Sequence, residues 1–161
     1  MSGLDFLSVA EARTERGFEP RAASPLARAL AGATGVRDLS LLGKLEVRGP
    51  VDLQDMDAEI LRITPTRALV ICEPERCAIL SGRLDGLVVD LTGAFAGIEI
   101  EGETLMRRLT DLDLDELPAA GKVAEVPALV SRQGPRFRIF FPQEYGDSVV
   151  EAVRDIDEGL K

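Results

Sequence analysis

The chain has 161 residues, 45% of them hydrophobic and 29% charged, which is enough for one domain with its own core. No apolar run approaches the ~20 residues of a spanning helix and no signal peptide is visible, so the sequence predicts a cytoplasmic protein without a membrane partner. Acidic residues outnumber basic ones by 28 to 19, and the net charge of −9 argues against nucleic acid as a partner. The absence of histidine excludes His-dependent nucleophiles and His-ligated metal ions.

Residues 1–34 differ in character from the rest of the chain. Their charges alternate in sign, and glycine and proline interrupt any helix. We therefore expect an N-terminal arm that is partly disordered or docks on a partner. Within the arm, a helical turn is predicted from Ser24, the N-cap, through Pro25 at the first helical position to Leu30. Residues 35–161 are expected to form the single folded domain.

The folded region is predicted to alternate short strands and short helices. Tyr145 and Met106 fall on apolar stripes and are predicted to be core residues. In chain order the predicted elements are a strand over 36–47, a hairpin with strands 60–63 and 68–71, a helix that begins at Glu73-Pro74 and buries Cys77, Leu80 and Leu84, strands over 87–91 and 98–101, a helix over 103–109, a hairpin with strands 122–132 and 136–141, and a helix over 143–156.

Two halves of this pattern match each other. The matches are Asp38-Leu39-Ser40 with Asp90-Leu91-Thr92, 52 residues later, Leu45–Gly49 with Ile98–Gly102, 53 residues later, and Leu69–Pro74 with Phe137–Pro142, 68 residues later. We interpret the domain as duplicated β-β-hairpin-helix units that merge into one mixed sheet covered by helices, which is an α+β fold.

Several segments carry a resemblance to known families. Val89–Thr92, Ile98–Glu103 and Leu109–Leu114, with Gly121 before a hairpin, resemble the aminomethyltransferase family with its folate-binding domain. Within that family, the chain is most similar to the gamma subunits of heterotetrameric sarcosine oxidase, over about residues 24–157. The segments that carry this second likeness are Ser24–Ala27, Leu42–Leu45 and Phe141–Tyr145.

The resemblance implies a fold like the aminomethyltransferase folate-binding domain, and two alternative functions. One is a non-catalytic, gamma-like subunit of a sarcosine-oxidase-type amine oxidase in one-carbon metabolism, with no cofactor of its own, packed against larger flavin-bearing subunits. The other is a standalone folate or one-carbon binding module, as a monomer or as a homo-oligomer, that binds tetrahydrofolate. Catalytic family members place an acidic pair after a Gly-rich turn, whereas Gln133-Gly134-Pro135 leads into Arg136 here, which disfavours tetrahydrofolate. An independent aminomethyltransferase ranks third.

Arg132, Arg136 and Arg138 are the candidate contact residues. They gather around one hairpin of an otherwise acidic chain and would suit an anion or the acidic face of a partner. The alternative is a solvated strand face. No catalytic residue and no metal ligand is predicted.

Acidic residues offer two further candidate sites. Asp38 and Asp90 recur at matching strand ends, where an acid–base pair would need to lie close together. We favour the alternative, in which each carboxylate caps a turn. Asp111, Asp113 and Asp115 begin like a calcium loop, but the later Gly and Glu of that motif are missing, so a solvated link is predicted.

The two cysteines, Cys72 and Cys77, are predicted to be reduced and mostly buried. A redox pair typically has the shorter Cys-x-x-Cys spacing. The sequence therefore predicts no redox role for them.

Overall fold

The structure, a computed structural model, describes residues 22–49, 53 and 57–160. Most of the predicted arm, residues 1–21, lies outside the described residues. In chain order the elements are β1 (Val36–Asp38), β2 (Gly43–Arg48), β3 (Glu59–Thr64), β4 (Arg67–Cys72), η3 (Pro74–Arg76), α1 (Cys77–Arg83), β5 (Leu87–Asp90), β6 (Phe95–Glu101), α2 (Glu103–Leu109), β7 (Ala119–Val123), β8 (Val126–Gln133), β9 (Arg136–Pro142), η4 (Gln143–Tyr145) and α3 (Gly146–Glu158). Within this part of the chain, no helix is long and apolar enough to span a membrane.

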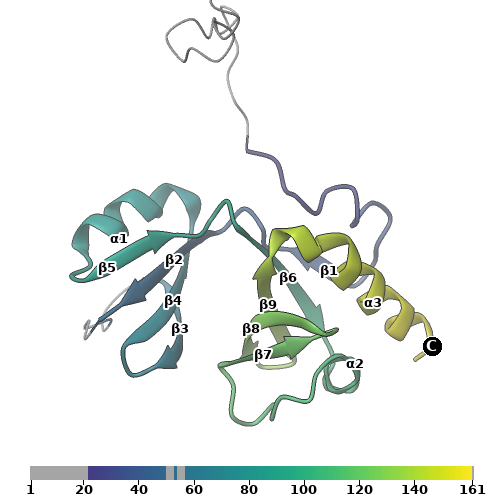
Figure 1. The fold of residues 1–161 in the computed structure, drawn as a ribbon. Helices are drawn as coiled ribbons and strands as arrows, with labels where there is room; N and C mark the ends of the chain where they lie inside the picture. Colours follow the sequence, from purple (N-terminus) through teal and green to yellow (C-terminus); the bar gives the residue numbers. More distant parts are fainter. Residues whose placement is uncertain (1–21, 50–52, 54–56, 161) are drawn as a thin grey trace, which may run out of the picture.

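The strands form two separate sheets that pack against each other, sheet B at the left of Figure 1 and sheet A at the right. Sheet A has the order β1-β6-β9-β8-β7, and sheet B has the order β3-β4-β2-β5. Every strand pairing among the described residues is antiparallel. The predicted α+β class is therefore confirmed, whereas the prediction of one merged, mixed sheet is wrong. Both sheets have apolar side chains on their two faces, so stacking one on the other buries surface that a single sheet would leave exposed.

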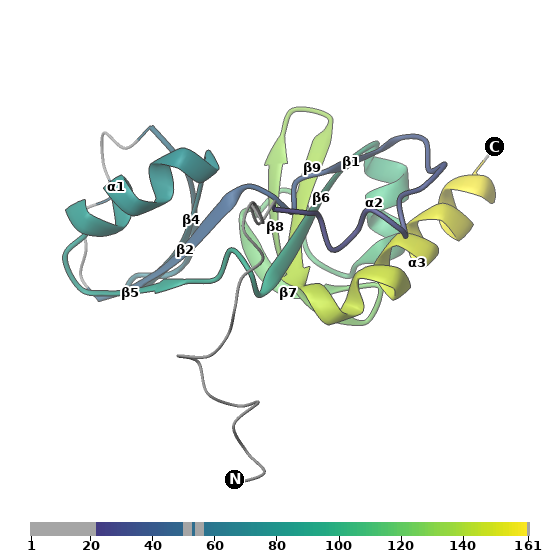
Figure 2. The same ribbon diagram turned by 90° about the horizontal axis from the view of Figure 1, so that it is seen from above.

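Three apolar clusters hold four layers together, which Figure 2 shows from above as α1, sheet B, sheet A and the pair α2 and α3. Leu80 of α1 packs on the outer face of sheet B with Leu45 and Val70. Between the sheets the buried apolar side chains are Leu39, Leu61, Leu69, Ile71 and Phe140. On the outer face of sheet A, residues of α2 and α3 pack on the strands, among them Met106, Leu109, Val149 and Val153.

Each half of the chain places its first strand in the sheet of the other half. β1 precedes β2 in the chain but pairs with β6 in sheet A, and β5 precedes β6 but pairs with β2 in sheet B. The chain therefore crosses between the sheets directly after β1 and again directly after β5. The predicted continuous strand over 36–47 is wrong for this reason, because residues 39–42 form the first crossing.

A carboxylate turns the chain at each crossing. Asp38 Oδ1 accepts a hydrogen bond of 2.8 Å from the backbone N–H of Ser40, and Asp90 Oδ1 accepts one of 2.8 Å from that of Thr92. The capping role predicted for both aspartates is confirmed. This local bond ends strand geometry at the carboxylate, which frees the chain to change sheets.

The two crossings make matching hydrogen bonds to a residue near the start of β6 and of β2. In the first crossing, Leu39 N donates to Gly97 O (2.8 Å) and Ser40 Oγ accepts from Gly97 N (3.2 Å). In the second crossing, Leu91 N donates to Lys44 O (2.8 Å) and Thr92 Oγ1 accepts from Lys44 N (3.0 Å). Gly97 and Lys44 thus occupy corresponding places in the two sheets.

The strand registers refine the sequence match. Cys72 pairs with Gly43 in sheet B, and Phe141 pairs with Ala96 in sheet A. Because Phe141 lies 69 residues after Cys72, the match of 68 residues for this strand is wrong by one. A shift of one residue exchanges the two faces of a strand, so the error would move core residues to the wrong side.

Two other predictions differ from the structure. The predicted strand over 122–132 is split into β7 and β8 by a turn at Ala124-Glu125, whose φ angles are 49° and 63°. Tight hairpins need such positive angles, but Asn-Gly or Asp-Gly usually signals them, and this turn has neither. Tyr145 is 41% exposed and is not a core residue, because it lies in the η4 turn before α3 begins. Met106 is fully buried, as predicted.

The described part of the arm packs on sheet A. Ser24 Oγ accepts a hydrogen bond of 3.0 Å from Leu26 N, in the predicted cap geometry. The Leu26 side chain is fully buried over the start of α3, where a Cβ at Gly146 would lie 2.5 Å from Leu26 Cδ2. The Gly146 position therefore leaves the space that Leu26 fills.

A substitution at Gly97 tests the packing between the sheets. A Cβ at this position would lie 2.8 Å from the ring of Phe140, which is fully buried in the cluster between the sheets. We expect Gly97→Ala to lower the free energy of unfolding by roughly 2 kcal/mol through overpacking. Gly82→Ala on α1 is the control, because its Cβ meets no atom within 4 Å. We expect the control to raise stability by up to about 1 kcal/mol in urea unfolding. Equal effects of the two changes would contradict this packing.

Candidate functional site

The three candidate arginines do not lie together. Arg136 and Arg138 are two residues apart on β9, so they share one face of sheet A with Phe140, but only Arg138 contacts sheet B. Arg132 pairs with Phe137, so it shares the outer face of sheet A with that core residue. The hairpin therefore divides the three charges between its two faces.

Arg138 joins the two sheets. Its Nε donates to Glu99 Oε2 (2.9 Å) on β6, and its Nη1 donates to Glu59 Oε2 (2.6 Å) on β3 of sheet B. Ser131 Oγ donates to the other oxygen of Glu59 (2.5 Å). Burial lowers the pKa of Arg138, but its hydrogen bonds to Glu99 and Glu59 outweigh this effect and raise the pKa above its ordinary value. This group is a hydrogen-bonded clamp between the sheets.

Glu99 is the acidic centre of this region and is only 5% exposed. Besides Arg138, it has Arg37 at 3.7 Å and Arg136 at 3.9 Å. Arg136 is also 3.9 Å from Glu101, and its side chain is 55% exposed. Arg136 is therefore the most loosely held of the predicted contact residues.

Arg132 is held on the outer face by other partners. Its Nη2 donates to Glu103 Oε2 (2.9 Å), its Nε donates to Gly134 O (3.0 Å), and its guanidinium lies 5.2 Å from the centre of the Phe137 ring. These contacts fix the side chain over the end of the hairpin.

Glu46 is the counterpart of Glu99 in sheet B. It accepts hydrogen bonds from Arg48 Nε (2.6 Å) and Arg67 Nε (2.7 Å) and is 5% exposed. Burial would raise the pKa of Glu46, but these hydrogen bonds and charges lower it below its usual range. The inner faces of both sheets thus carry a buried glutamate neutralised by arginines.

Lys44 is a buried charge, although the sequence predicts no more for it than a place in the strand over 36–47. Its side chain is fully buried, and its Nζ donates to Ser40 O and Leu42 O, both at 2.7 Å. Burial lowers the pKa of Lys44 to about 8, although the carboxylates of Asp38 and Asp90 favour its charged form. Lys44 therefore satisfies backbone carbonyls of the first crossing at the cost of a buried ammonium group.

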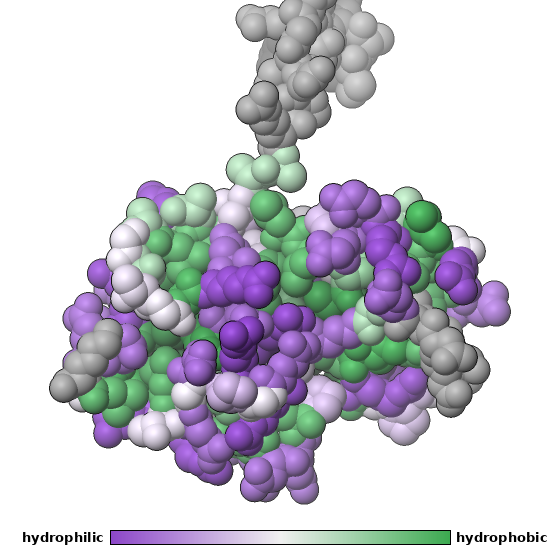
Figure 3. Space-filling view, turned by 180° about the vertical axis from the view of Figure 1, so that it is seen from behind, coloured by the Kyte–Doolittle hydropathy of each residue, from purple (hydrophilic) through white to green (hydrophobic). Residues whose placement is uncertain are grey.

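A cavity of about 540 Å³ lies beside the Arg138 clamp. Its described lining includes no aromatic side chain on which a flavin or pterin ring could stack, and its Arg76 is paired with Asp57. Seen from behind, hydrophilic side chains gather in the middle of the molecule with hydrophobic areas on either side (Figure 3). The lining residues are Leu42, Asp57, Ala58, Glu59, Ile71, Cys72, Glu73, Arg76, Gln133 and Arg138.

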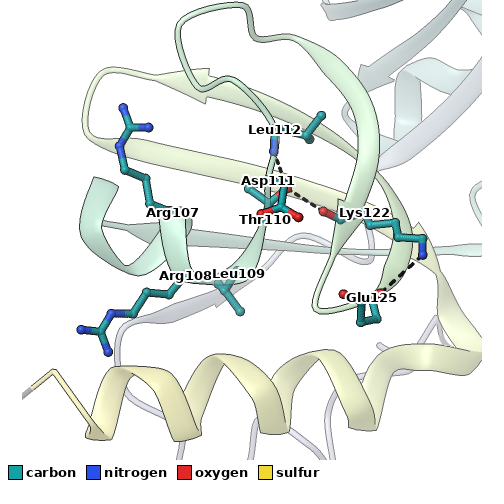
Figure 4. A pocket seen from close by; sticks show the side chains of 8 residues that line it. All are labelled: Arg107, Arg108, Leu109, Thr110, Asp111, Leu112, Lys122 and Glu125. Carbon is teal, nitrogen blue, oxygen red and sulfur yellow. Dashed lines mark hydrogen bonds and ion pairs between the residues drawn. The ribbon is translucent and has the colours of Figure 1, made fainter.

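A second cavity of about 440 Å³ follows α2 (Figure 4). Thr110 Oγ1 donates to Lys122 O (2.6 Å), and Lys122 Nζ lies 3.4 Å from Glu125. Arg107 and Arg108 point away from these residues in Figure 4. Thr110, Lys122 and Glu125 are thus held by contacts with one another, and the two arginines are directed outward.

The predicted acidic link over Asp111–Asp115 lies beside that cavity. Asp113 Oδ1 accepts a hydrogen bond from Asp115 N (3.0 Å), which is a local turn contact. Among the described residues, no three Cys, Asp or Glu side chains are grouped so that they could hold a metal ion.

The pH dependence of stability tests the buried ammonium group. Because the pKa of Lys44 is about 8 when folded and 10.5 ordinarily, the folded state holds the charge at a cost below pH 8. That cost decreases as the pH rises from about 8 to 10.5, because the folded chain has then released the proton that the unfolded chain still holds. We expect the free energy of unfolding, measured relative to Lys44→Met, to rise by about 2 kcal/mol between pH 7 and pH 10. A difference that stays constant or falls with pH would contradict the burial of a charged Lys44.

The fold, compared as a whole, is similar to solved structures. No protein-family model and no curated protein matches the sequence. A chain of the heterotetrameric sarcosine oxidase from Corynebacterium sp. U-96, in complex with pyrrole 2-carboxylate, has a TM-score of 0.69 and 20% identity, over 84% of this chain and 94% of that chain. A chain of the aspartokinase alpha and beta subunits has a TM-score of 0.50 and 11% identity, over 78% of this chain and 98% of that one. The chain thus shares its fold with a chain of a heterotetrameric sarcosine oxidase.

Proposed function

We propose that this chain is a small, non-catalytic subunit of a sarcosine-oxidase-type amine oxidase. The observation that carries the proposal is the extent of the fold similarity. It spans 84% of this chain and 94% of a chain in a heterotetrameric sarcosine oxidase, so nearly the whole of each chain takes part. A domain within a larger enzyme would give a much lower coverage of one of the two chains.

The chemistry of the inner faces supports a non-catalytic role. Glu46 and Glu99 are neutralised by neighbouring arginines, and Lys44 is enclosed by the backbone carbonyls of a crossing. These buried charges serve the contact between the sheets. A catalytic acid, base or nucleophile would instead have to face a substrate.

Finer details of the proposal come from the resemblance in sequence. The subunit would be of the gamma type, related to the aminomethyltransferase folate-binding domain, and would act in the cytoplasm in one-carbon metabolism. It would bind neither flavin nor tetrahydrofolate itself, and larger partner subunits would carry the flavin. The lack of an aromatic side chain in the described lining of the larger cavity supports this assignment.

We also propose that the two halves arose by duplication. The strand order β5-β2-β4-β3 in sheet B corresponds to β1-β6-β9-β8 in sheet A, where β7 is an additional edge. A 3-10 turn and a helix follow β4 and β9 alike. The reciprocal hydrogen bonds of the two crossings also support the proposal.

Co-purification tests the subunit proposal. The tagged full chain, expressed in its own organism and purified at low salt, is expected to bring larger chains with the visible absorbance of flavin and with sarcosine-dependent oxygen consumption. In a parallel measurement, tetrahydrofolate is not expected to raise the melting temperature of the isolated chain. Recovery of the chain alone, or a clear rise in melting temperature with tetrahydrofolate, would contradict the proposal.

We also propose that Arg136 contacts the larger subunits. A pair of arginine variants tests this contact. Its side chain is 55% exposed and its ion pairs are 3.9 Å long, so a partner's carboxylate could compete for it. We expect Arg136→Ala to lower the flavin recovered with the tagged chain several-fold. Arg107→Ala is the matched control, because Arg107 is 54% exposed and paired on α2. Equal flavin recovery with both variants would rule out this contact.

A further inference from the structure

The two cysteines lie against each other. Cys72 is the last residue of β4 and Cys77 the first of α1, and their sulfur atoms are 3.5 Å apart. The intervening η3 turn, Pro74–Arg76, bends the chain back so that four intervening residues bring the thiols into contact. The sequence spacing, which argued against a redox pair, is thus compensated by this turn.

Gly43 makes the room that both sulfur atoms share. A Cβ at this position would lie 1.9 Å from Cys77 Sγ and 2.9 Å from Cys72 Sγ. Gly43 pairs with Cys72 in the β2–β4 register, so the strand positions are fixed by backbone hydrogen bonds. Packing therefore confines the two thiols to one small space above a residue that has no side chain.

The surroundings distinguish the two thiols. Cys72 is 5% exposed, and burial together with its hydrogen bond to Cys77 raises its pKa to about 12, so it keeps its proton. Cys77 is half-buried and is the more exposed of the two residues. The ammonium group of Lys44 is near enough to interact with both sulfurs, and Arg76 with that of Cys72. These cations would stabilise negative charge that develops on sulfur during a reaction.

We propose that Cys72 and Cys77 form a peroxide-reactive dithiol that closes to an intramolecular disulfide. In the first step, Cys77 gives up its proton and its sulfur attacks one peroxide oxygen, the O–O bond breaks, and the leaving hydroxide takes up that proton as water. Cys77 is then a sulfenic acid. In the second step, Cys72 sulfur attacks Cys77 sulfur, the S–S bond forms, the S–O bond breaks, and the hydroxide leaves with the Cys72 proton as water. The two thiols lose two electrons in all, and hydrogen peroxide is reduced to two waters.

The geometry suits this closure. The sulfurs need to approach from 3.5 Å to the ~2.05 Å of a disulfide, and both are side-chain ends on neighbouring elements. The resulting bond would tie the end of β4 to the start of α1, and Cys72 lines the cavity beside the Arg138 clamp. The inference concerns this chain alone and does not depend on the proposed function.

Thiol counting after peroxide treatment tests the proposal. The folded full chain is treated with hydrogen peroxide, denatured, alkylated with iodoacetamide and weighed by mass spectrometry. We expect both alkylations to be lost together and to return after treatment with dithiothreitol. The circular dichroism spectrum should not change with the peroxide treatment. Independent loss of one alkylation, a disulfide between two chains, or two thiols that stay alkylatable would overturn it.

Single variants separate the roles of the two thiols. With Cys72→Ser, the sulfenic acid on Cys77 has no second thiol to resolve it, so we expect a dimedone adduct at Cys77 in the folded protein. With Cys77→Ser, the remaining Cys72 is buried and we expect at least ten-fold less dimedone adduct. Equal labelling of the two variants, with circular dichroism unchanged, would show that Cys77 is not the attacking sulfur and would contradict the proposed order of steps.

Discussion

The exchange of first strands between the two sheets is the constraint on which the rest of this structure depends. Because β1 belongs to sheet A and β5 to sheet B, neither sheet is complete without residues from the other half of the chain. The two crossings that follow these strands are fixed by capping carboxylates and by reciprocal backbone bonds. The two sheets are thereby joined into one folding unit.

Stacking the sheets also explains why so many charges are buried. Lys44, Glu46 and Glu99 lie on inner strand faces, where each must find hydrogen bonds because water is excluded. Carbonyl oxygens of a crossing serve Lys44, and arginines serve the glutamates. Since these buried polar groups satisfy one another, a partner would be recognised by exposed side chains such as Arg136.

Local features of the structure were predictable from the sequence where they depend on local chemistry. The bounds of α2, the hairpin of β3 and β4, and the capping by Asp38 and Asp90 follow from periodicity, turn residues and carboxylate chemistry. The stacking of two sheets was not predictable. In Lys44-Leu45-Glu46-Val47, charged and apolar residues alternate, as in a strand with one solvated face, although both faces are covered.

For the candidate sites too, the sequence predicts local features but not those that depend on tertiary packing. Sequence spacing placed Arg132, Arg136 and Arg138 on one hairpin, but their division between two faces follows from the register of β8 and β9. The contact between the two thiols depends on Gly43, which lies on a strand far from either cysteine in the chain. Such relations arise from tertiary packing, which no local pattern contains.

Fragment complementation tests the strand exchange most directly. Residues 1–84 and 85–161, cut in the exposed link between α1 and β5, would each lack one strand of their sheet. The account predicts that neither fragment alone unfolds cooperatively, and that the two expressed together form a one-to-one complex with a single cooperative transition. A fragment that stays monomeric and unfolds cooperatively by itself would contradict the account.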